Sequence, residues 1–259
     1  MAKTIAVIPD VQVKAGQDFT FLDHVGKYLV DKKPDVIVQI GDFADMESLS
    51  SYDQGKKSFE GRRYIKDIEA AKSAMESLLA PLREAQAKAK RNKEKIYKPR
   101  LVLTLGNHEE RIKRAVNDDP KLEGLIKYGD LPYTDWEIYD YLDVVEIEGI
   151  CFSHFFTTGV MGRPVTSAKA LLMKKHQSCV MGHVQKMEIA TEYKADGTMI
   201  TGLFSGCCYE HDEAYLGKQG NHHFRGIHML YDVNNGEFHT HSITLKYLRE
   251  KYGKENLGN

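Results

Sequence analysis

A chain of 259 residues with 42% hydrophobic and 28% charged side chains can bury a substantial core, as one domain or at most as two small ones. Its formal net charge of -1 excludes a global attraction to nucleic acids or membranes and leaves only a local patch as an alternative. No apolar run approaches the roughly 20 residues that span a bilayer, so we expect no membrane partner.

The N-terminus and the cysteines predict where the protein works. The opening residues MAKTIAVIPD pass directly into a strand-like run without the pattern of a signal peptide. The four cysteines show no CxxC spacing, and the adjacent pair Cys207 and Cys208 cannot easily bridge. We therefore expect reduced thiols in a cytoplasmic protein.

Three short apolar segments in the first half predict β-strands. Residues 4–8, 35–40 and 100–105 are unbroken apolar runs, which is typical of strands covered on both faces. Between the first two, residues 19–34 repeat apolar side chains at helical spacing. This strand–helix–strand order predicts an α/β fold with a parallel sheet.

The segment between the second and third strands predicts an insertion. Residues 46–65 are typical of an irregular loop, and residues 66–95 predict a long charged helix with an interruption considered at Pro81. Its basic end, residues 88–100, is interpreted as a solvated helix terminus, with contact to a phosphate backbone as the alternative. After the third strand, short helices are expected at 109–116 and 122–128.

From about residue 143 the pattern becomes rich in strands joined by tight turns. The predicted strand segments are 144–154, 178–193, 197–206, 226–233 and 237–245. An α/β half followed by a β-rich half is compatible with two domains. Because no Pro/Ser/Gly-rich linker separates the halves, we favour one domain over residues 1–259, with a helical insertion at about 46–99 and two packed sheets.

Polar side chains able to bind metal follow almost every apolar strand. In chain order they are Asp10 and Gln12, Asp42 and Asp45, Asn107 and His108, His154, and finally His183 and Gln185. Each alone has an ordinary explanation, such as a helix cap for Asp42, a turn for Asn107 or a half-buried His154. Because ligands in open α/β sheets bind beyond the carboxyl ends of the strands, the set together predicts a metal site.

The motifs DVQ, GDFAD, GNHE, SHFF and GHVQ occur in an order that resembles the calcineurin-like metallophosphoesterase superfamily over residues 10–185. The sequence around them is most similar to compact members encoded by bacteriophages, which implies the host cytoplasm as the location. The resemblance implies a four-layer α-β-β-α sandwich of two mixed sheets. It also implies two divalent metal ions over the strand ends.

The resemblance further implies which residues hold the metals. Asp42 would be the bridging carboxylate, and Asn107, His154 and His183 would complete one site. Asp10 would belong to the other site. A bridging carboxylate brings two cations together and tempers their repulsion, whereas an amide oxygen binds without adding negative charge.

At two positions the chain departs from the family pattern. Gln12 and Gln185 stand where the family has histidines, and both would belong to the site of Asp10. Because an amide oxygen is a harder and weaker donor than imidazole, Mn²⁺ is the favoured metal, with Mg²⁺, Fe²⁺, Zn²⁺ and Ni²⁺ as alternatives. His108 matches the catalytic histidine of the family, and Asp45 matches the carboxylate that orients it.

Substrate contacts are predicted on three polar segments, 46–65, 157–164 and 206–226, and on the helix after GNHE. The candidates are Arg111, Arg163, His211, His222 and Arg225. For Arg111, a structural ion pair on its own helix is an equally good interpretation.

The leading hypothesis is a hydrolase that cleaves phosphoesters with a metal-activated water, with phosphodiesters of nucleic acids or nucleotides as the favoured substrates. A phosphomonoesterase for proteins or small molecules is the close alternative, because the same centre serves both. A module that binds phosphate or nucleic acid without turnover is a third hypothesis. A metal-free dinucleotide-binding domain is excluded, since no GxGxxG follows the first strand.

Overall fold

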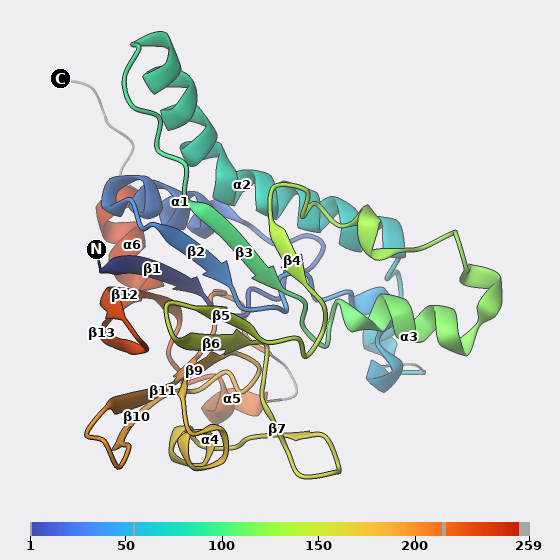
Figure 1. Ribbon diagram of the computed structural model, residues 1–259. Helices are drawn as coiled ribbons and strands as arrows, with labels where there is room; N and C mark the ends of the chain where they lie inside the picture. The colour runs from blue at the N-terminus through green and yellow to red at the C-terminus, as the bar shows by residue number, and fades with distance from the viewer. Residues whose placement is uncertain (1, 54, 214–215, 254–259) are drawn as a thin grey trace.

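The computed structural model describes residues 2–53, 55–213 and 216–253, and its larger sheet has six strands (Figure 1). In spatial order these are β13 (Glu237–Thr244), β12 (Gly226–Asn234), β1 (Lys3–Ile8), β2 (Val36–Gln39), β3 (Arg100–Thr104) and β4 (Glu137–Tyr139). Strands β1 to β4 are parallel, and β12 and β13 extend the sheet antiparallel. The predicted parallel start of the sheet is confirmed.

The second sheet has five strands. In order they are β10 (Met187–Tyr193), β11 (Met199–Ser205), β9 (Ser178–Met181), β6 (Ile150–Ser153) and β5 (Val145–Ile147). Its three central strands are parallel, and the two edge strands are antiparallel to their neighbours. A separate two-stranded ribbon pairs β7 (Thr157–Thr158) with β8 (Arg163–Pro164).

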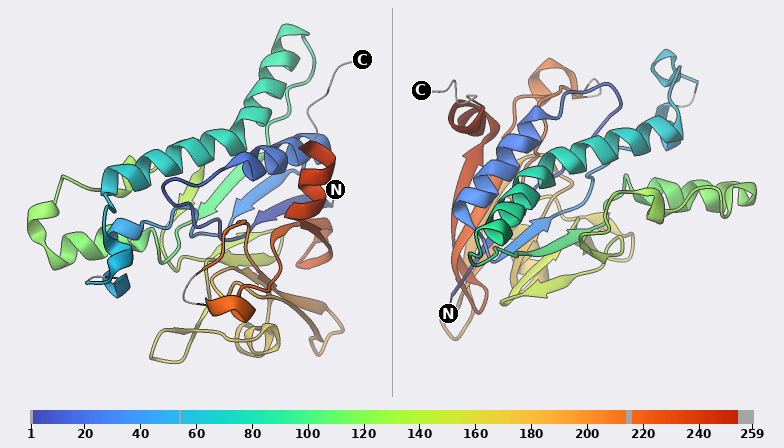
Figure 2. Two further views of the ribbon diagram at one scale, coloured as in Figure 1. Left: turned by 180° about the vertical axis from the view of Figure 1, so that it is seen from behind. Right: turned by 90° about the horizontal axis from the view of Figure 1, so that it is seen from above.

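Helices cover both outer faces of the stacked sheets, whereas α3 (Glu110–Asp118) projects beyond their end (Figures 1 and 2). Helices α1 (Thr20–Lys32), α2 (Tyr64–Arg91) and α6 (Leu245–Tyr252) cover the larger sheet, and α4 (Ala168–Lys175) covers the smaller one. This arrangement is the predicted four-layer α-β-β-α sandwich of two mixed sheets, so the fold class is confirmed.

Alternation along the strands explains the layers. In β1, Ala6 faces α1 and α2 while its neighbour Val7 faces the second sheet, and both are fully buried. Phe152 and Leu203 of the second sheet pack into the same inter-sheet core. Each such side chain contributes roughly 1.5–3 kcal/mol when buried, which explains why these strands read as unbroken apolar runs.

Helix α2 runs through Pro81 without the interruption that we considered. Pro81 lies where α2 crosses α1 at Gly26, and an added Cβ at Gly26 would lie 2.4 Å from the Leu78 carbonyl oxygen. We attribute the continuity of α2 on both sides of Pro81 to this close packing against α1. The basic end of α2 and residues 92–99 lead into the start of β3, at the sheet edge opposite the carboxyl ends of the strands.

Two further helix predictions had different outcomes. Helix α3 (Glu110–Asp118) confirms the first. The helix expected at 122–128 is wrong, because the chain forms 3₁₀ turns η4 (Pro120–Leu122) and η5 (Tyr128–Asp130) around Gly124, whose φ is +78°. A left-handed residue ends a helix rather than continuing it.

The remaining elements are short. In the described part of the loop predicted at 46–65, which omits residue 54, the elements before α2 are 3₁₀ turns, namely η1 (Glu47–Leu49), η2 (Ser51–Asp53) and η3 (Lys57–Phe59). Helix α5 (Gly217–Gly220), α4, α6, β4 and the β7–β8 ribbon were not anticipated from the sequence. Within the described residues, no helix is long and apolar enough to cross a membrane.

Candidate metal centre

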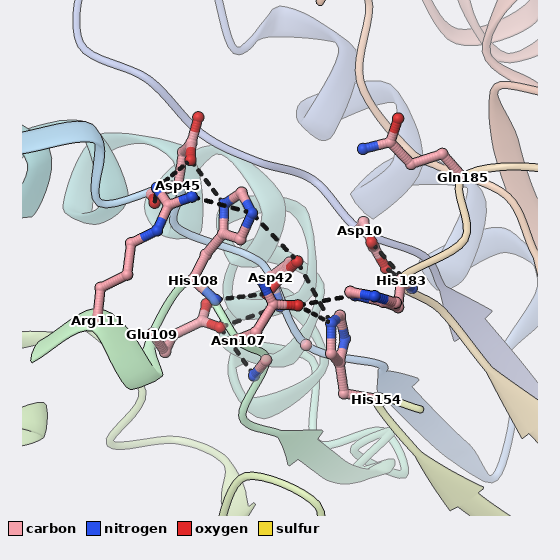
Figure 3. Close-up of polar contacts among 12 residues, drawn as sticks. Asp10, Asp42, Asp45, Asn107, His108, Glu109, Arg111, His154, His183 and Gln185 are labelled. Atoms are coloured by element: carbon pink, nitrogen blue, oxygen red, sulfur yellow. Dashed lines mark hydrogen bonds and ion pairs between the residues drawn. The ribbon is translucent and has the colours of Figure 1, made fainter. Parts of the chain in front are cut away.

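The carboxyl ends of parallel strands from both sheets meet at one place (Figure 3). The larger sheet contributes Asp42 beyond β2, and the smaller one contributes His154 beyond β6 and His183 beyond β9. One ligand atom from each of these side chains lies within 4.8 Å of the other two. Asp42 and His154 are buried and His183 is partly buried, so the three groups form a compact cluster suited to a metal ion.

Asn107, beyond β3, adds a fourth donor to this cluster. Its Oδ1 lies 3.0 Å from Nε2 of His154 and 2.8 Å from Nδ1 of His183. Nε2 of His154 also lies 3.3 Å from Oδ2 of Asp42. An amide oxygen, a carboxylate and two imidazoles therefore converge, and this is a donor set that divalent transition metals accept.

The tautomer of His154 suits a ligand. Its Nδ1 lies 2.9 Å from the carbonyl oxygen of Ile40, an acceptor, so Nδ1 carries the proton and donates it. Nε2 then offers its lone pair toward Asp42 and Asn107. A ring nitrogen that donates to a backbone carbonyl is the usual support for a metal-binding histidine. The residues present therefore fit a divalent ion.

Asp10 lies beside the cluster, at the end of β1. Both of its carboxylate oxygens accept the backbone N–H of His183, at 3.1 and 3.0 Å. Its own carbonyl oxygen accepts the N–H of Cys208 at 2.7 Å. The side chain is fully buried, so Asp10 is a second carboxylate held rigidly next to the four converging donors.

The charges in this centre favour an added cation. Burial raises the pKa of Asp10 to about 7, with the charge of Asp42 adding to the effect. Burial opposes ionisation of Asp42 too, but His108 and His154 lower its pKa well below the ordinary value. For His154 burial acts downward, yet Asp42 and Asp10 raise its pKa to about 9. The two buried carboxylates therefore favour a positive charge at His154. A proton or a divalent metal ion can supply that charge.

His183 has the opposite character. Burial lowers its pKa to about 4, and the positive charge of His154 adds to the decrease. Its ring packs at 4.6 Å against Phe155. A neutral imidazole at ordinary pH is the form that binds metals.

Several predicted site residues have left-handed backbones. The φ values are +48° at Gln12, +49° at Asp42, +65° at His183 and +25° at Gln185. Such conformations cost roughly 1–3 kcal/mol each in a non-glycine residue and concentrate at functional sites. At Gln12 the strained turn lets its N–H donate to the Asp42 carbonyl oxygen at 2.8 Å, which joins the ends of β1 and β2.

Glycines before the ligands make room for neighbouring carboxylates. A Cβ at Gly106 would lie 2.0 Å from Oδ1 of Asp42, and a Cβ at Gly182 would lie 2.2 Å from Oδ1 of Asp10. Neither position can carry a side chain without moving a ligand. Glycine is therefore required for steric reasons immediately before Asn107 and His183, which the spacing of the motifs alone did not reveal.

Gln185 is placed differently from the other predicted ligands. Its side-chain oxygen accepts a hydrogen bond from the Tyr209 hydroxyl at 3.0 Å. In Figure 3 its amide lies apart from Asp42 and Asn107, and no dashed line joins it to them. Gln12 is 2% exposed. The ligand roles of both glutamines stay predictions.

Comparison with known proteins decides the family. Residues 3–190 match the model of the calcineurin-like phosphoesterases. This chain belongs to that family. It is therefore a metal-dependent phosphoesterase, a hydrolase acting on phosphoesters.

Other comparisons are more distant. A solved structure of a conserved uncharacterized protein from Streptococcus pneumoniae TIGR4, described as a predicted phosphoesterase, is 12% identical with a TM-score of 0.38, and the match covers 95% of this chain and 91% of that chain. A second solved structure is 14% identical with a TM-score of 0.35, covering 94% of this chain and 100% of that one. No curated protein matches the chain.

In this phosphoesterase, His108 lies beside the cluster and is held by Asp45. Its Nδ1 is 2.6 Å from Oδ1 of Asp45, and its Nε2 is 3.7 Å from Oδ2 of Asp42. Although burial acts downward, these two carboxylates raise the pKa of His108. The structure thus brings together the two residues predicted to act in catalysis.

Asp45 contacts other charged side chains in addition to His108. Nη1 of Arg111 donates to its Oδ1 at 2.8 Å, and Nζ of Lys14 lies 3.3 Å from its Oδ2. Lys14 also pairs with Glu213. Arg111 is therefore in an ion pair, but its partner lies outside its own helix α3, where we had considered one. Lys14 was missed from the sequence, because its partners lie far along the chain.

Glu109 is a second residue that sequence reasoning passed over, although it ends the GNHE motif. Its buried carboxylate accepts the N–H of Asp42 at 3.0 Å, of Ala44 at 3.0 Å and of Gly106 at 2.9 Å. The Tyr133 hydroxyl donates to it at 2.9 Å. Glu109 thereby holds the loop of Asp42 against the loop of Asn107.

The other predicted substrate contacts lie outside this cluster. Arg163 is exposed in the β7–β8 ribbon, and His222 is exposed before β12. His211 stacks on Tyr209 at 4.3 Å and pairs with Glu213 at 2.8 Å. Arg225 donates to the Glu210 carbonyl oxygen and pairs with Asp212. Their roles toward substrate stay predictions.

Proposed function

We propose that this phosphoesterase hydrolyses phosphodiesters of nucleic acids or nucleotides, using two divalent ions. The observation that carries the proposal is the convergence of Asp42, Asn107, His154 and His183 beside the His108–Asp45 pair. A divalent ion in such a site neutralises the phosphate charge and lowers the pKa of a water nucleophile.

Different sets of residues would hold the two ions. Asp42, Asn107, His154 and His183 would hold one ion, and Asp10 with Asp42 would hold the other. The carboxylates stay buried, which keeps the site dry and strengthens its electrostatic interactions. These positions support two adjacent ions that share Asp42.

His108 would act on the leaving group. Although burial acts downward, Asp42 and Asp45 raise the pKa of His108 and so favour its imidazolium form, in which Nε2 also carries a proton for a departing alkoxide oxygen. Nη2 of Arg111 lies 3.3 Å from that nitrogen, which places a positive charge next to the developing negative one.

The test is hydrolysis of bis-p-nitrophenyl phosphate and p-nitrophenyl phosphate with Mn²⁺. We expect turnover of the diester, and a drop of about 100-fold or more in kcat for Asp42→Ala and Asn107→Ala, since even supporting residues of metal sites cost 10–100-fold. Turnover of the monoester alone would make the protein a phosphomonoesterase. Bound metal without turnover of either substrate would make it a binding module, and full activity in both variants would refute the site.

Mn²⁺ as the metal is a proposal that rests on the two glutamines. Asp10 with amide donors forms an oxygen-rich site, which suits Mn²⁺ or Mg²⁺ better than Zn²⁺. We expect the double variant Gln12→His, Gln185→His to lose its dependence on Mn²⁺ in an activity assay across metals. An unchanged metal preference would count against a role for these residues.

The cellular setting follows from the sequence resemblance alone. We propose a compact, bacteriophage-type member that acts in the host cytoplasm, with nucleic acid as partner and no membrane. With a near-neutral net charge of -1, any attraction to nucleic acid would come from local basic groups.

A further inference from the structure

Two cavities lie at the edge of the proposed site, one beside His108 and Asp45 and the other beside Asn107. The larger, about 740 Å³, is lined by Gln12 and His108 among others, and the smaller, about 490 Å³, is lined by Asn107. Tyr52 and Arg111 line both. These two side chains therefore stand on the boundary between the cavities, next to the proposed reaction centre.

The residues that line each cavity indicate which group of the substrate that cavity would hold. His108, the proposed proton donor, lines only the larger one, so the departing alcohol must lie there. The smaller cavity holds Asn107 together with Arg114, whose Nη2 donates to the Asn107 carbonyl oxygen at 2.6 Å. The group that stays on the phosphorus would then lie on this second side.

We infer that the substrate is a phosphodiester with a sizeable group on each ester oxygen, and that a nucleoside on the retained side occupies the smaller cavity against Tyr52. This inference rests on the proposed function and sharpens its substrate class. Both volumes lie in the range of small-molecule sites, roughly 300–1,000 Å³. A phosphomonoester has one ester group and would fill only one cavity.

Tyr52 is the observation that favours a nucleoside. Its side chain is 80% exposed, which is unusual for a large aromatic residue beside an active site. The cavity that Tyr52 lines also holds Arg111 and Arg114, together with Asp118 and Asp119. An open aromatic ring in a cavity with cationic side chains matches the combination of base stacking and phosphate contact used for single-stranded nucleic acids.

Two substrates with the same leaving group isolate the retained side. Thymidine 5′-(p-nitrophenyl phosphate) and methyl p-nitrophenyl phosphate both release p-nitrophenolate and differ only in the group that stays on phosphorus. We expect a KM about tenfold or more lower for the thymidine ester, since stacking on one aromatic ring is worth that much. Tyr52→Ala should remove most of this advantage, and Tyr52→Phe, which keeps the ring, should retain it.

Blocking each cavity tests the assignment. Ala115 lines the smaller cavity, and Ala115→Trp should raise KM about tenfold for the thymidine ester and less than about twofold for the methyl ester. Ser58 is an exposed residue of the larger cavity, and Ser58→Trp should impair both esters alike. Thermal melting of each variant separates a blocked cavity from a folding defect, and the exposed Tyr52 provides a test free of that concern.

The outcomes separate the inference from the function on which it rests. Equal KM values for the two esters, or an unchanged ratio in Tyr52→Ala, would overturn the inference while leaving phosphodiesterase activity intact. A selective loss of the thymidine ester in Ser58→Trp would overturn the assignment of the two sides. Failure to hydrolyse either ester would refute the proposed function itself.

Discussion

The carboxylate of Glu109 links parts of the chain that are far apart in sequence. It accepts backbone N–H groups from the loops after β2 and β3 and the hydroxyl of Tyr133. A carboxylate has only acceptor oxygens, so all of these buried donors are satisfied at once. Burial and the charge of Asp42 raise the pKa of Glu109, so the ionised form that accepts these donors carries a free-energy cost.

Glu109→Gln should therefore be damaging despite its similar shape. An amide offers one acceptor oxygen, so donors on its other side lose their partner, at about 1–3 kcal/mol for each buried group. We expect a loss of about 3 kcal/mol in the free energy of unfolding and weaker metal binding, measured by denaturation and calorimetry. Tyr133→Phe removes a single donor and should cost about 1 kcal/mol. Equal stability of Glu109→Gln and the wild type would contradict this account.

His228 in β12 predicts a pH dependence of stability away from the metal centre. It is fully buried, with Nε2 2.8 Å from the Ser205 carbonyl oxygen and Nδ1 2.9 Å from Oγ of Ser242. Burial lowers its pKa to about 4. The unfolded chain, with an ordinary pKa near 6.5, binds the proton first, so stability falls as the pH drops from about 6.5 toward 4.

Between pH 7 and pH 5, this single group should cost about 2 kcal/mol. Urea denaturation at both pH values measures the loss. His228→Gln replaces the imidazole with a side chain that does not titrate, so the difference between its two free energies should be smaller than that of the wild type by this amount. An identical pH dependence in the variant would show that His228 is not responsible.

At the scale of elements, the crossing of α1 and α2 depends on the absence of a side chain at Gly26. An added Cβ would lie 2.4 Å from the Leu78 carbonyl oxygen and 3.0 Å from the Pro81 ring. The backbone of α2 cannot move away cheaply, because its inner face packs on the larger sheet. The proline and the glycine together fix how closely the helices approach.

Gly26→Ala should destabilise the protein, even though alanine favours helices. Overpacking at such a contact costs roughly 1–3 kcal/mol, more than the gain of about 1 kcal/mol in helix propensity. Gly129→Ala is the matched control, since a Cβ there meets nothing closer than 3.7 Å. Thermal melting should therefore show a lower midpoint for Gly26→Ala only, and a variant as stable as the wild type would disprove the steric argument.

At the scale of the molecule, the metal centre joins the two sheets. Asp42 and Asn107 come from the larger sheet, and His154 and His183 come from the smaller one. The inter-sheet core likewise combines Val38 of the first half with side chains of the second. This shared core supports the proposal that residues 1–259 form one domain.

Removal of metal should consequently lower the stability of the whole fold. A ligand that binds only the native state adds about 2.7 kcal/mol when present at 100 times its Kd. We expect a chelator to lower the melting temperature of the wild type, and to have no effect on Asp42→Ala, which lacks the ligand shared by both proposed ions. Coincident melting curves of the wild type with and without chelator would argue against a structural contribution of the metal.

The sequence by itself determined most of the strands and the order of the polar residues at their ends, but it missed β4 and the β7–β8 ribbon and merged β5 with β6 and β9 with β10. Strands buried on both faces must be apolar throughout, and neighbouring parallel strands end at one edge of a sheet, so Asp42 and Asn107 were predictable neighbours, whereas His154 reaches them from the other sheet. The fold class followed from the same motifs. Local signals were weaker where tertiary contacts compete, as the continuous helix at Pro81 and the turns at 122–128 show.

Only the tertiary structure decided which further groups surround the centre. The contacts of Gln185 with Tyr209, of Lys14 with Glu213 and of Glu109 with its donors join residues distant in the chain. Hydrogen bonds and cavities of this kind depend on how separate loops pack against each other. That packing cannot be predicted from the residue types or the spacing within one segment. The two cavities that share Tyr52 are likewise formed by loops that pack together in the folded chain. They are the basis of the substrate that we infer for this phosphoesterase.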